Sequence, residues 1–241
     1  MTKKISKREQ PPRAAKMIRS ELLKLMTEPD PMRVGSKIGS AVGIYAFFDY
    51  DDEPIYVGQT SSKFRDRVGR HLTGQRSDAV GKFILDPFEV AEVAMWSVPE
   101  VLTARDPNDP AKTAPVALKR RMLAPYEFSV YRELERDSQF GAVLNEGVIL
   151  PTEEVVLPDE VRGRIIPDEL WEDRRHSDIR IARRAATVAR LSQMISEREV
   201  SGGMRRTLLL QAKRLQWLAQ QRLYEIGAET PDAEDLKIVD D

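Results

Sequence analysis

The chain has 241 residues, a formal net charge of −1, 41% hydrophobic and 32% charged residues, a composition typical of a folded protein with one large domain or a domain and an appendage. It has no cysteine, which excludes disulfides, thiolate nucleophiles and zinc fingers. No apolar run approaches the roughly 20 residues needed to cross a membrane, and the N-terminus lacks an apolar signal segment. We therefore expect no membrane partner and a cytoplasmic location.

Residues 1–40 are expected to form a basic tail followed by a helix from Arg13 to Met26. Two apolar runs, Val42 to Phe48 and Pro54 to Gly58, then flank an acidic turn, a pattern typical of a β-hairpin. Helical apolar spacing follows from Phe64 to Thr73.

In the middle of the chain, Val80 to Leu85 is expected to form a short helix and Phe88 to Val98 a third strand, buried on both faces near its end. The turn chemistry of Arg105 to Pro115 predicts a loop. Val116 to Asp137 is expected to be helical, with Pro125 opening a new helix, because proline is tolerated in a first turn.

Val143 to Leu150 is expected to be extended and to complete a domain spanning residues 41–150. An acidic connector at 151–173 then leads to a basic helical hairpin at 174–228, broken at Gly202-Gly203, and to an acidic tail at 229–241. The predicted fold class is α/β: a small, mainly antiparallel three-stranded sheet flanked by helices, with a C-terminal helical hairpin.

Charge is segregated in the last third. Residues 146–173 hold nine acidic side chains and two arginines, whereas residues 174–225 hold twelve basic and four acidic side chains. Because a polyanion responds to the local face rather than to the chain average, the near-neutral total does not exclude nucleic acid as a partner.

The hairpin region carries a pattern with chemical meaning. Gly43-Ile44-Tyr45 and Tyr56-Val57-Gly58 place one phenol on each strand. Arg67 and His71 lie four residues apart on the following helix and therefore share a face. Two phenols, a guanidinium and an imidazole near a small sheet suit chemistry on a phosphate.

With Glu127 on a later helix and Asn145 beyond it, this pattern resembles the GIY-YIG nuclease superfamily over about residues 42–145. The resemblance implies an endonuclease that uses Mg²⁺ or Mn²⁺ to hydrolyse DNA phosphodiester bonds. A role in restriction or phage defence is our first expectation, and repair or mobile-element function is the alternative. A non-catalytic DNA-binding or partner-binding protein on the same scaffold is the rival from another class.

The resemblance implies that Tyr45 deprotonates water or relays its proton, which for a phenol with a usual pKa near 10 requires nearby cations. Tyr56 would help to hold the scissile phosphate or its waters. Either tyrosine can instead be a packed strand residue. Arg67 would stabilise charge on the phosphate, and His71 would orient water, transfer a proton or touch phosphate.

Gly43 and Gly58 are interpreted structurally, as close-approach or turn positions. Gln59 departs from the family pattern, because many relatives carry lysine there. The metal ligand implied by the resemblance is Glu127, with Glu133 as the alternative, and Asn145 would support the site through hydrogen bonds.

Basic residues of the C-terminal helices can neutralise phosphates without reading sequence. The candidates, with one on the earlier helix, are Arg70, Arg180, Arg183, Arg184, Arg205, Arg206, Lys213 and Arg214. The alternatives are a solvated hairpin or one that pairs with the acidic connector. The apolar stripes of these helices also permit a homodimer.

Overall fold

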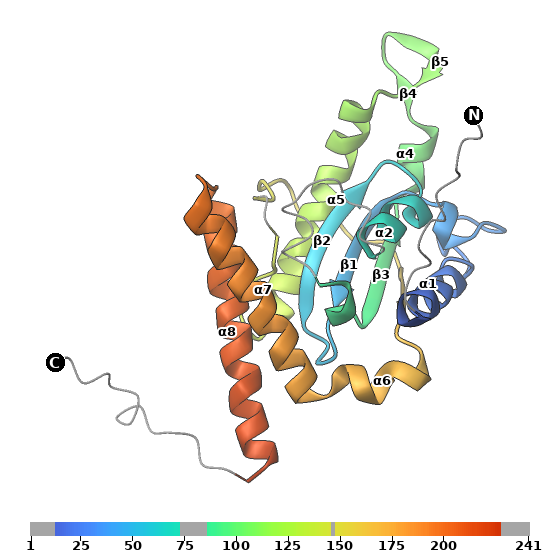
Figure 1. Cartoon of the computed structure of the whole chain (residues 1–241). Coiled ribbons are helices and arrows are strands. Elements are labelled where there is room, and N and C mark those ends of the chain that lie inside the picture. The colour runs from blue at the N-terminus through green and yellow to red at the C-terminus, as the bar shows by residue number, and fades with distance from the viewer. Residues whose placement is uncertain (1–12, 73–85, 146–147, 228–241) are drawn as a thin grey trace, which may run out of the picture.

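An antiparallel sheet of four strands, in the order β2-β1-β3-β6, forms the centre of the fold (Figure 1). The computed structural model describes residues 13–72, 86–145 and 148–227. The strands of the sheet are β1 (Gly43–Phe48), β2 (Pro54–Thr60), β3 (Glu92–Ser97) and β6 (Glu160–Arg164). A separate ribbon is formed by β4 (Arg105–Asp106) and β5 (Asp109–Thr113).

The α-helices are α1 (Arg13–Leu25), α2 (Phe64–Leu72), α4 (Pro99–Thr103), α5 (Val116–Asp137), α6 (Asp168–Arg175), α7 (Ser177–Glu197) and α8 (Gly202–Glu225). Short 3₁₀ turns are η1 (Ile38–Ser40) and η2 (Pro87–Glu89). The expected tails at 1–11 and 229–241 and the expected helix from Val80 to Leu85 lie outside the described residues. None of the helices in the described ranges is long and apolar enough to cross a membrane.

The sheet separates two apolar layers because side chains alternate between its faces. Tyr45 and Phe47 of β1 face the layer that α1 and α2 cover, whereas Ile44 and Ala46 face the layer that α5 covers. In Figure 1, α2 crosses in front of the strands and α5 lies behind them. All six residues of β1 are buried, which explains its continuous apolar run.

The sheet has four strands rather than the expected three. The fourth, β6, pairs with β3 inside the segment that was expected to be an acidic connector, and α6 follows it. The polar sequence of this segment did not indicate a strand. In the structure, Arg162 of β6 forms a salt bridge with Glu92, and Gly163 leaves space for Leu25 of α1. A Cβ at Gly163 would lie 2.7 Å from a methyl carbon of Leu25.

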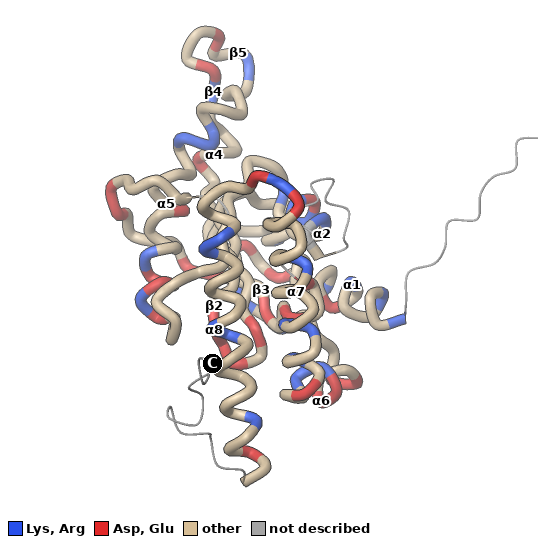
Figure 2. The backbone as a smooth tube through the Cα atoms, turned by 60° about the vertical axis from the view of Figure 1, so that its left-hand side comes forward, with Lys and Arg blue, Asp and Glu red and all other residues tan. Residues whose placement is uncertain are grey.

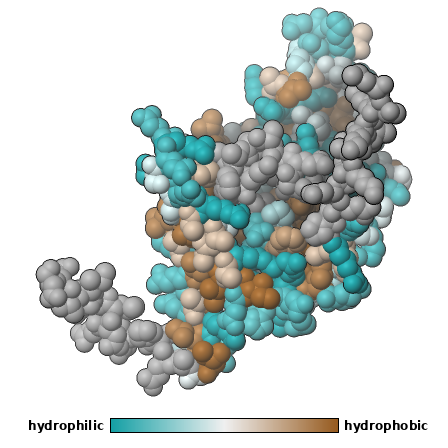
Figure 3. Space-filling view, viewed as in Figure 1, coloured by the Kyte–Doolittle hydropathy of each residue, from teal (hydrophilic) through white to brown (hydrophobic). Residues whose placement is uncertain are grey.

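Two further expectations were wrong in detail. Pro125 lies inside the single helix α5 and does not open a new one. Its missing N–H removes one helical hydrogen bond, yet the helix continues because burial of Leu123 and Val130 against the sheet holds both halves in line. The expected loop from Arg105 to Pro115 contains the β4–β5 ribbon, which projects from the rest of the fold and is mostly hydrophilic at its tip (Figures 1 and 3).

The C-terminal helices form the expected hairpin. Ser201 accepts a hydrogen bond from the backbone N–H of Met204 and begins α8. The apolar stripes that could have served a dimer instead pack within the chain. Leu191, Met194 and Met204 form a cluster between α7 and α8, and Leu210 joins the layer on the α1 and α2 side of the sheet.

Candidate active site

Tyr45 lies in the central strand β1 and its side chain is fully buried. Its ring centroid lies 5.5 Å from that of Phe47 and 6.0 Å from that of Tyr56, which is half-buried on the edge strand β2. Tyr45 pairs across the strands with Gly58. The structure therefore brings the two predicted phenols side by side on one face of the sheet.

The two predicted glycines are required by close contacts. A Cβ on Gly58 would lie 2.8 Å from Oη of Tyr45 and 2.8 Å from Cε1 of Tyr56, so both phenols need the space that glycine leaves. Gly43 has a φ of +151°, and a Cβ there would lie 2.0 Å from the carbonyl oxygen of Trp96. Both glycines thus have structural roles.

Arg67 connects helix α2 to Tyr45. Phe64 and Val68 anchor α2 in the apolar layer, which aims the half-buried Arg67 at the sheet. Its Nε donates a hydrogen bond of 3.3 Å to Oη of Tyr45. His71 lies one turn further along α2, and its side chain falls outside the described residues.

The surroundings of Tyr45 disfavour a phenolate. Burial raises the pKa of Tyr45 well above the usual value of a phenol, and the neighbouring Tyr56 raises it further. The Arg67 guanidinium lowers this pKa, but its effect is smaller. At neutral pH, Tyr45 is therefore a protonated hydroxyl that accepts a hydrogen bond from Arg67.

Glu127 lies on α5 and is held by the edge strand of the sheet. Nε2 of Gln59, in β2, donates a hydrogen bond of 2.6 Å to Oε2 of Glu127. Burial raises the pKa of the Glu127 carboxyl above its usual value. The hydrogen bond from Gln59 and the charge of Arg67 lower this pKa, but their effects are smaller than that of burial. Arg67 thus acts electrostatically on both Tyr45 and Glu127, and it links the two halves of the candidate site.

The environment of Gln59 was not foreseen, because the sequence identified this residue only as a missing cation. Its Oε1 is buried and has no hydrogen-bond partner in the described part of the chain. An unpaired buried carbonyl costs about 1–3 kcal/mol, so this oxygen is a ready acceptor beside the Glu127 carboxylate. The signal in the sequence was only that a glutamine, which can donate and accept at once, stands directly after Gly58.

Glu133, the alternative metal ligand, is exposed and lies near Glu160, whose pKa it helps to raise. Six residues separate it from Glu127, so the two project from different sides of α5. The structure places Glu127, and not Glu133, beside Gln59.

The residues around Glu127 fit a hard divalent cation that keeps much of its hydration shell. Glu127 has no salt bridge to a described residue, and the unpaired Oε1 of Gln59 can accept a hydrogen bond from a metal-bound water. Within the described ranges, no cluster of three or more histidine, aspartate or glutamate side chains could enclose a metal. The donor set therefore suits Mg²⁺ or Mn²⁺ bound by one carboxylate together with water and substrate oxygens.

Asn145 braces the edge strand. Its Oδ1 accepts a hydrogen bond of 3.0 Å from the Val57 N–H, and its Nδ2 donates a hydrogen bond of 2.9 Å to the Val57 carbonyl. It satisfies both main-chain groups of one β2 residue, midway between Tyr56 and Gly58. These two hydrogen bonds hold the segment after α5 against β2.

Four arginines that were expected to contact DNA are occupied elsewhere, namely Arg180, Arg183, Arg184 and Arg214. The carboxylate of Asp49, at the β1–β2 turn, lies 2.6 Å from Arg184, 2.8 Å from Arg214 and 3.4 Å from Arg180. All three arginine side chains are at least 96% buried. In Figure 2, both acidic and basic residues mark the backbone in the region of β2, α7 and α8. These arginines cannot reach a DNA phosphate, because leaving Asp49 would break a buried ion pair and leave an uncompensated charge inside the fold.

Arg183 is paired as well, at 3.5 Å from Glu89, and its side chain is 15% exposed. These four arginines therefore pair with the acidic β1–β2 turn and with Glu89, and not with the acidic connector that was considered as the alternative. Of the expected phosphate contacts, Arg70, Arg205, Arg206 and Lys213 remain exposed.

Residues 41–102 match the sequence model of the family described as the GIY-YIG catalytic domain. The match contains Tyr45, Tyr56, Arg67 and His71, and it ends before Glu127. Neither a curated protein nor a solved structure matches the chain. The resemblance expected from the two tyrosine motifs is confirmed for residues 41–102, which are similar to the GIY-YIG catalytic domain.

Proposed function

We propose that the protein is a divalent-metal-dependent endonuclease that hydrolyses DNA phosphodiester bonds. The observation that carries this proposal is the position of Arg67. It donates a hydrogen bond to Tyr45, and its positive charge lowers the pKa of Glu127. A guanidinium between a phenol and a half-buried carboxylate suits a phosphate group bound at the same place. The family match to residues 41–102 supports the same chemical class.

Glu127 and the Oε1 of Gln59 would hold the cation and one of its waters. A bound Mg²⁺ or Mn²⁺ would act as a Lewis acid that neutralises charge on the phosphate oxygens. Arg67 would share that charge through its guanidinium group. Water attacks phosphorus in line, the P–O bond opposite it breaks, and the products are a phosphate monoester end and a hydroxyl end.

Tyr45 would relay the proton of the attacking water while it stays a neutral phenol, and it would not act as a phenolate base. The raised pKa of Tyr45 supports this choice, because a buried phenolate would be costly before substrate and metal bind. Tyr56 is the adjacent hydroxyl on the more exposed strand, so it would continue the relay or orient the phosphate. His71 is proposed as a further water- or phosphate-orienting group.

The test is cleavage of a supercoiled plasmid with Mg²⁺ or Mn²⁺ by the wild-type protein and by Tyr45→Phe and Glu127→Ala. Each variant should lose a factor of about 100 or more in rate, the loss typical of removing a general acid–base or charge-stabilising group. Wild-type cleavage that persists in both variants would refute the site. No metal-dependent cleavage of any DNA by the wild-type protein would favour the non-catalytic alternative.

Restriction or phage defence is the biological role that we propose first, because surface basic residues outside the matched domain can add DNA contacts. Repair and mobile-element functions are the competing roles. Plating efficiency of phages on cells that express wild type or Glu127→Ala distinguishes them. Protection that depends on Glu127 would support defence, and equal plating on both strains would count against it.

A further inference from the structure

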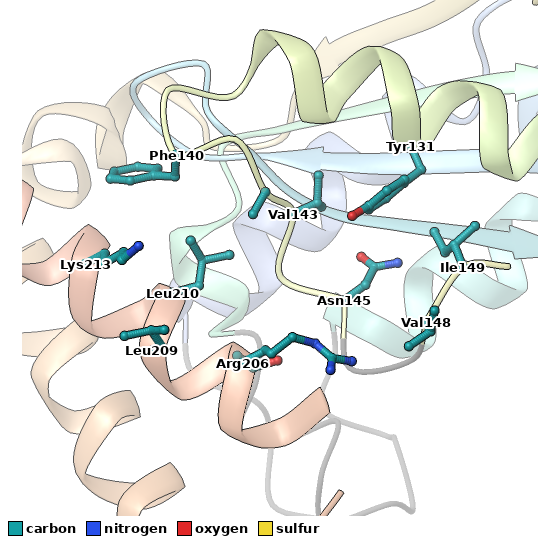
Figure 4. Close-up of a pocket in the computed structure, with 12 residues that line it drawn as sticks. Tyr131, Phe140, Val143, Asn145, Val148, Ile149, Arg206, Leu209, Leu210 and Lys213 are labelled. Atoms are coloured by element: carbon teal, nitrogen blue, oxygen red, sulfur yellow. The ribbon is translucent and has the colours of Figure 1, made fainter. Parts of the chain in front are cut away.

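A cavity of about 490 Å³ opens between the end of α5, the segment that follows it and helix α8 (Figure 4). This volume is within the range of small-ligand sites. The residues around it are Tyr131, Phe140, Ala142, Val143, Asn145, Val148, Ile149, Arg206, Thr207, Leu209, Leu210 and Lys213. We call this cavity the α5–α8 pocket.

The α5–α8 pocket lies next to residues that support the candidate active site, and Asn145 belongs to both. Tyr131 follows Glu127 by four residues on α5, so it lies on the same face about 6 Å further along the helix axis. Asn145, on another wall, is hydrogen-bonded to Val57, two residues before Gln59 in β2. A strand with one phosphate at Glu127 therefore has this pocket within reach of its next nucleotides.

The lining of the pocket combines apolar and cationic groups. Val143, Leu210 and the aromatic rings of Tyr131 and Phe140 provide apolar walls. Arg206 and Lys213, seven residues apart, project from one face of α8. Both are exposed, and neither has an acidic partner within salt-bridge distance among the described residues, in contrast to Arg214 on the same helix.

We propose that the α5–α8 pocket binds an unpaired nucleotide of the DNA substrate, with the base against its apolar wall and the adjoining phosphates on Arg206 and Lys213. This inference rests on the proposed function in taking DNA as the ligand. An apolar pocket with a cationic rim complements a single strand, whose bases can leave the stack and contact aromatic side chains. A duplex presents mainly phosphates at its surface and would leave the apolar wall unused.

It follows that the protein selects DNA with unpaired nucleotides beside the scissile phosphate, such as a flap, a gap or a bubble. The test measures binding in EDTA, so that no cleavage occurs. The probes are a fluorescent single strand of about 20 nucleotides, which exceeds the usual binding-site size, and the same sequence as a duplex. The wild-type protein should bind the single strand more tightly at every salt concentration.

Two variants change the pocket in different ways. Arg206→Ala combined with Lys213→Ala should weaken single-strand binding about tenfold at low salt and reduce the slope of log K against log salt by about 1.4, since each phosphate contact contributes about 0.7. Ala142→Leu fills part of the pocket with a side chain that cannot stack. It should weaken single-strand binding and leave duplex binding unchanged.

The matched control removes two exposed arginines that lie outside the pocket lining, Arg190 of α7 and Arg198 directly after that helix. This double alanine variant should bind both probes nearly as the wild type does. Thermal unfolding of each variant verifies that the fold is intact.

Equal wild-type affinity for both probes, or equal losses on both probes in the pocket variants, would overturn the proposal. Tighter binding of the matching RNA strand would overturn DNA as the occupant. The inference and the proposed function fail separately. Plasmid cleavage without single-strand preference would refute the pocket alone, whereas single-strand binding without any cleavage would refute the nuclease proposal alone.

Discussion

Gln59 Nε2 donates a hydrogen bond of 2.6 Å to Glu127 Oε2, and this contact joins the edge of the sheet to the helix behind it. It holds the carboxylate of a half-buried glutamate in one orientation and favours its ionised form. Gln59 is thus a positioning residue for Glu127.

Replacing Gln59 with leucine removes the hydrogen bond that lowers the pKa of Glu127, so this pKa should rise. Because only the carboxylate binds a cation, the acid limb of the pH–rate profile should move to higher pH, and activity at pH 6 should fall by a larger factor than activity at pH 8. The Mg²⁺ concentration for half-maximal rate should rise about 10–100-fold, as for other groups that orient a metal ligand. An acid limb that stays in place would contradict the role assigned to Gln59.

A methyl group at Gly58 should disturb both tyrosines. The Cβ of Gly58→Ala would lie 2.8 Å from Oη of Tyr45, so the ring must move out of reach of Arg67. Cleavage should fall about 100-fold, since small misplacements at a reacting centre have effects of that size. The matched control is Gly69→Ala on α2, where the new methyl meets no heavy atom within 4 Å and should stabilise the helix by up to about 1 kcal/mol. Comparable activity in the two variants would refute the steric argument.

Arg67→Lys keeps the charge and loses the planar set of donors that reaches Tyr45. The rate of cleavage should fall by about 10²–10³, while binding of DNA in EDTA stays within a factor of a few. The control is Arg65→Lys on the exposed side of α2, which should retain wild-type rates. If both substitutions prove equally harmless, the contact of 3.3 Å to Tyr45 has no part in the chemistry.

Asp49→Asn should strongly destabilise the fold. It removes the carboxylate that neutralises three buried arginines, and breaking such a network costs about 3–5 kcal/mol in free energy of unfolding. Burial raises the pKa of Asp49, but Arg214, Arg184 and Arg180 outweigh burial and lower it below the usual value. A lowered pKa gives stability that is present above the unfolded-state pKa and lost as the pH falls through the folded-state pKa.

The difference between wild type and Asp49→Asn should therefore be full at neutral pH and shrink on acidification. Urea unfolding at several pH values measures it. Asp66→Asn, an exposed change on α2, should stay within about 0.5 kcal/mol of the wild type. A gap between wild type and Asp49→Asn that widens in acid would contradict the network as described.

Local patterns predicted the local structure. The hairpin from Val42 to Gly58, the helix that carries Arg67 and the buried third strand each have an apolar run or apolar periodicity bounded by turns, so their positions follow from nearest neighbours in the chain. The preference for Glu127 over Glu133 as metal ligand came from the family resemblance and stays a prediction.

The misjudged features depend on distant partners. Arg184 and Asp49 are 135 residues apart, so a run of arginines on a helix gave no sign that it would be neutralised inside the fold. In strand β6, the polar residue Arg162 forms salt bridges with Glu92 and Asp52, which lie more than sixty residues earlier in the chain. Gln59 seemed a loss of positive charge until the fold placed it against a carboxylate.

The order of the strands in the sheet also determines how a truncated form of the protein would behave. Strand β3 is an inner strand only because β6 covers its far side, and β6 is translated some sixty residues later. A fragment that ended at Asn145 would keep the residues discussed around Tyr45 and Glu127 but leave the buried β3 with an unpaired edge. Such an edge recruits other chains, so this fragment should self-associate where the full chain does not.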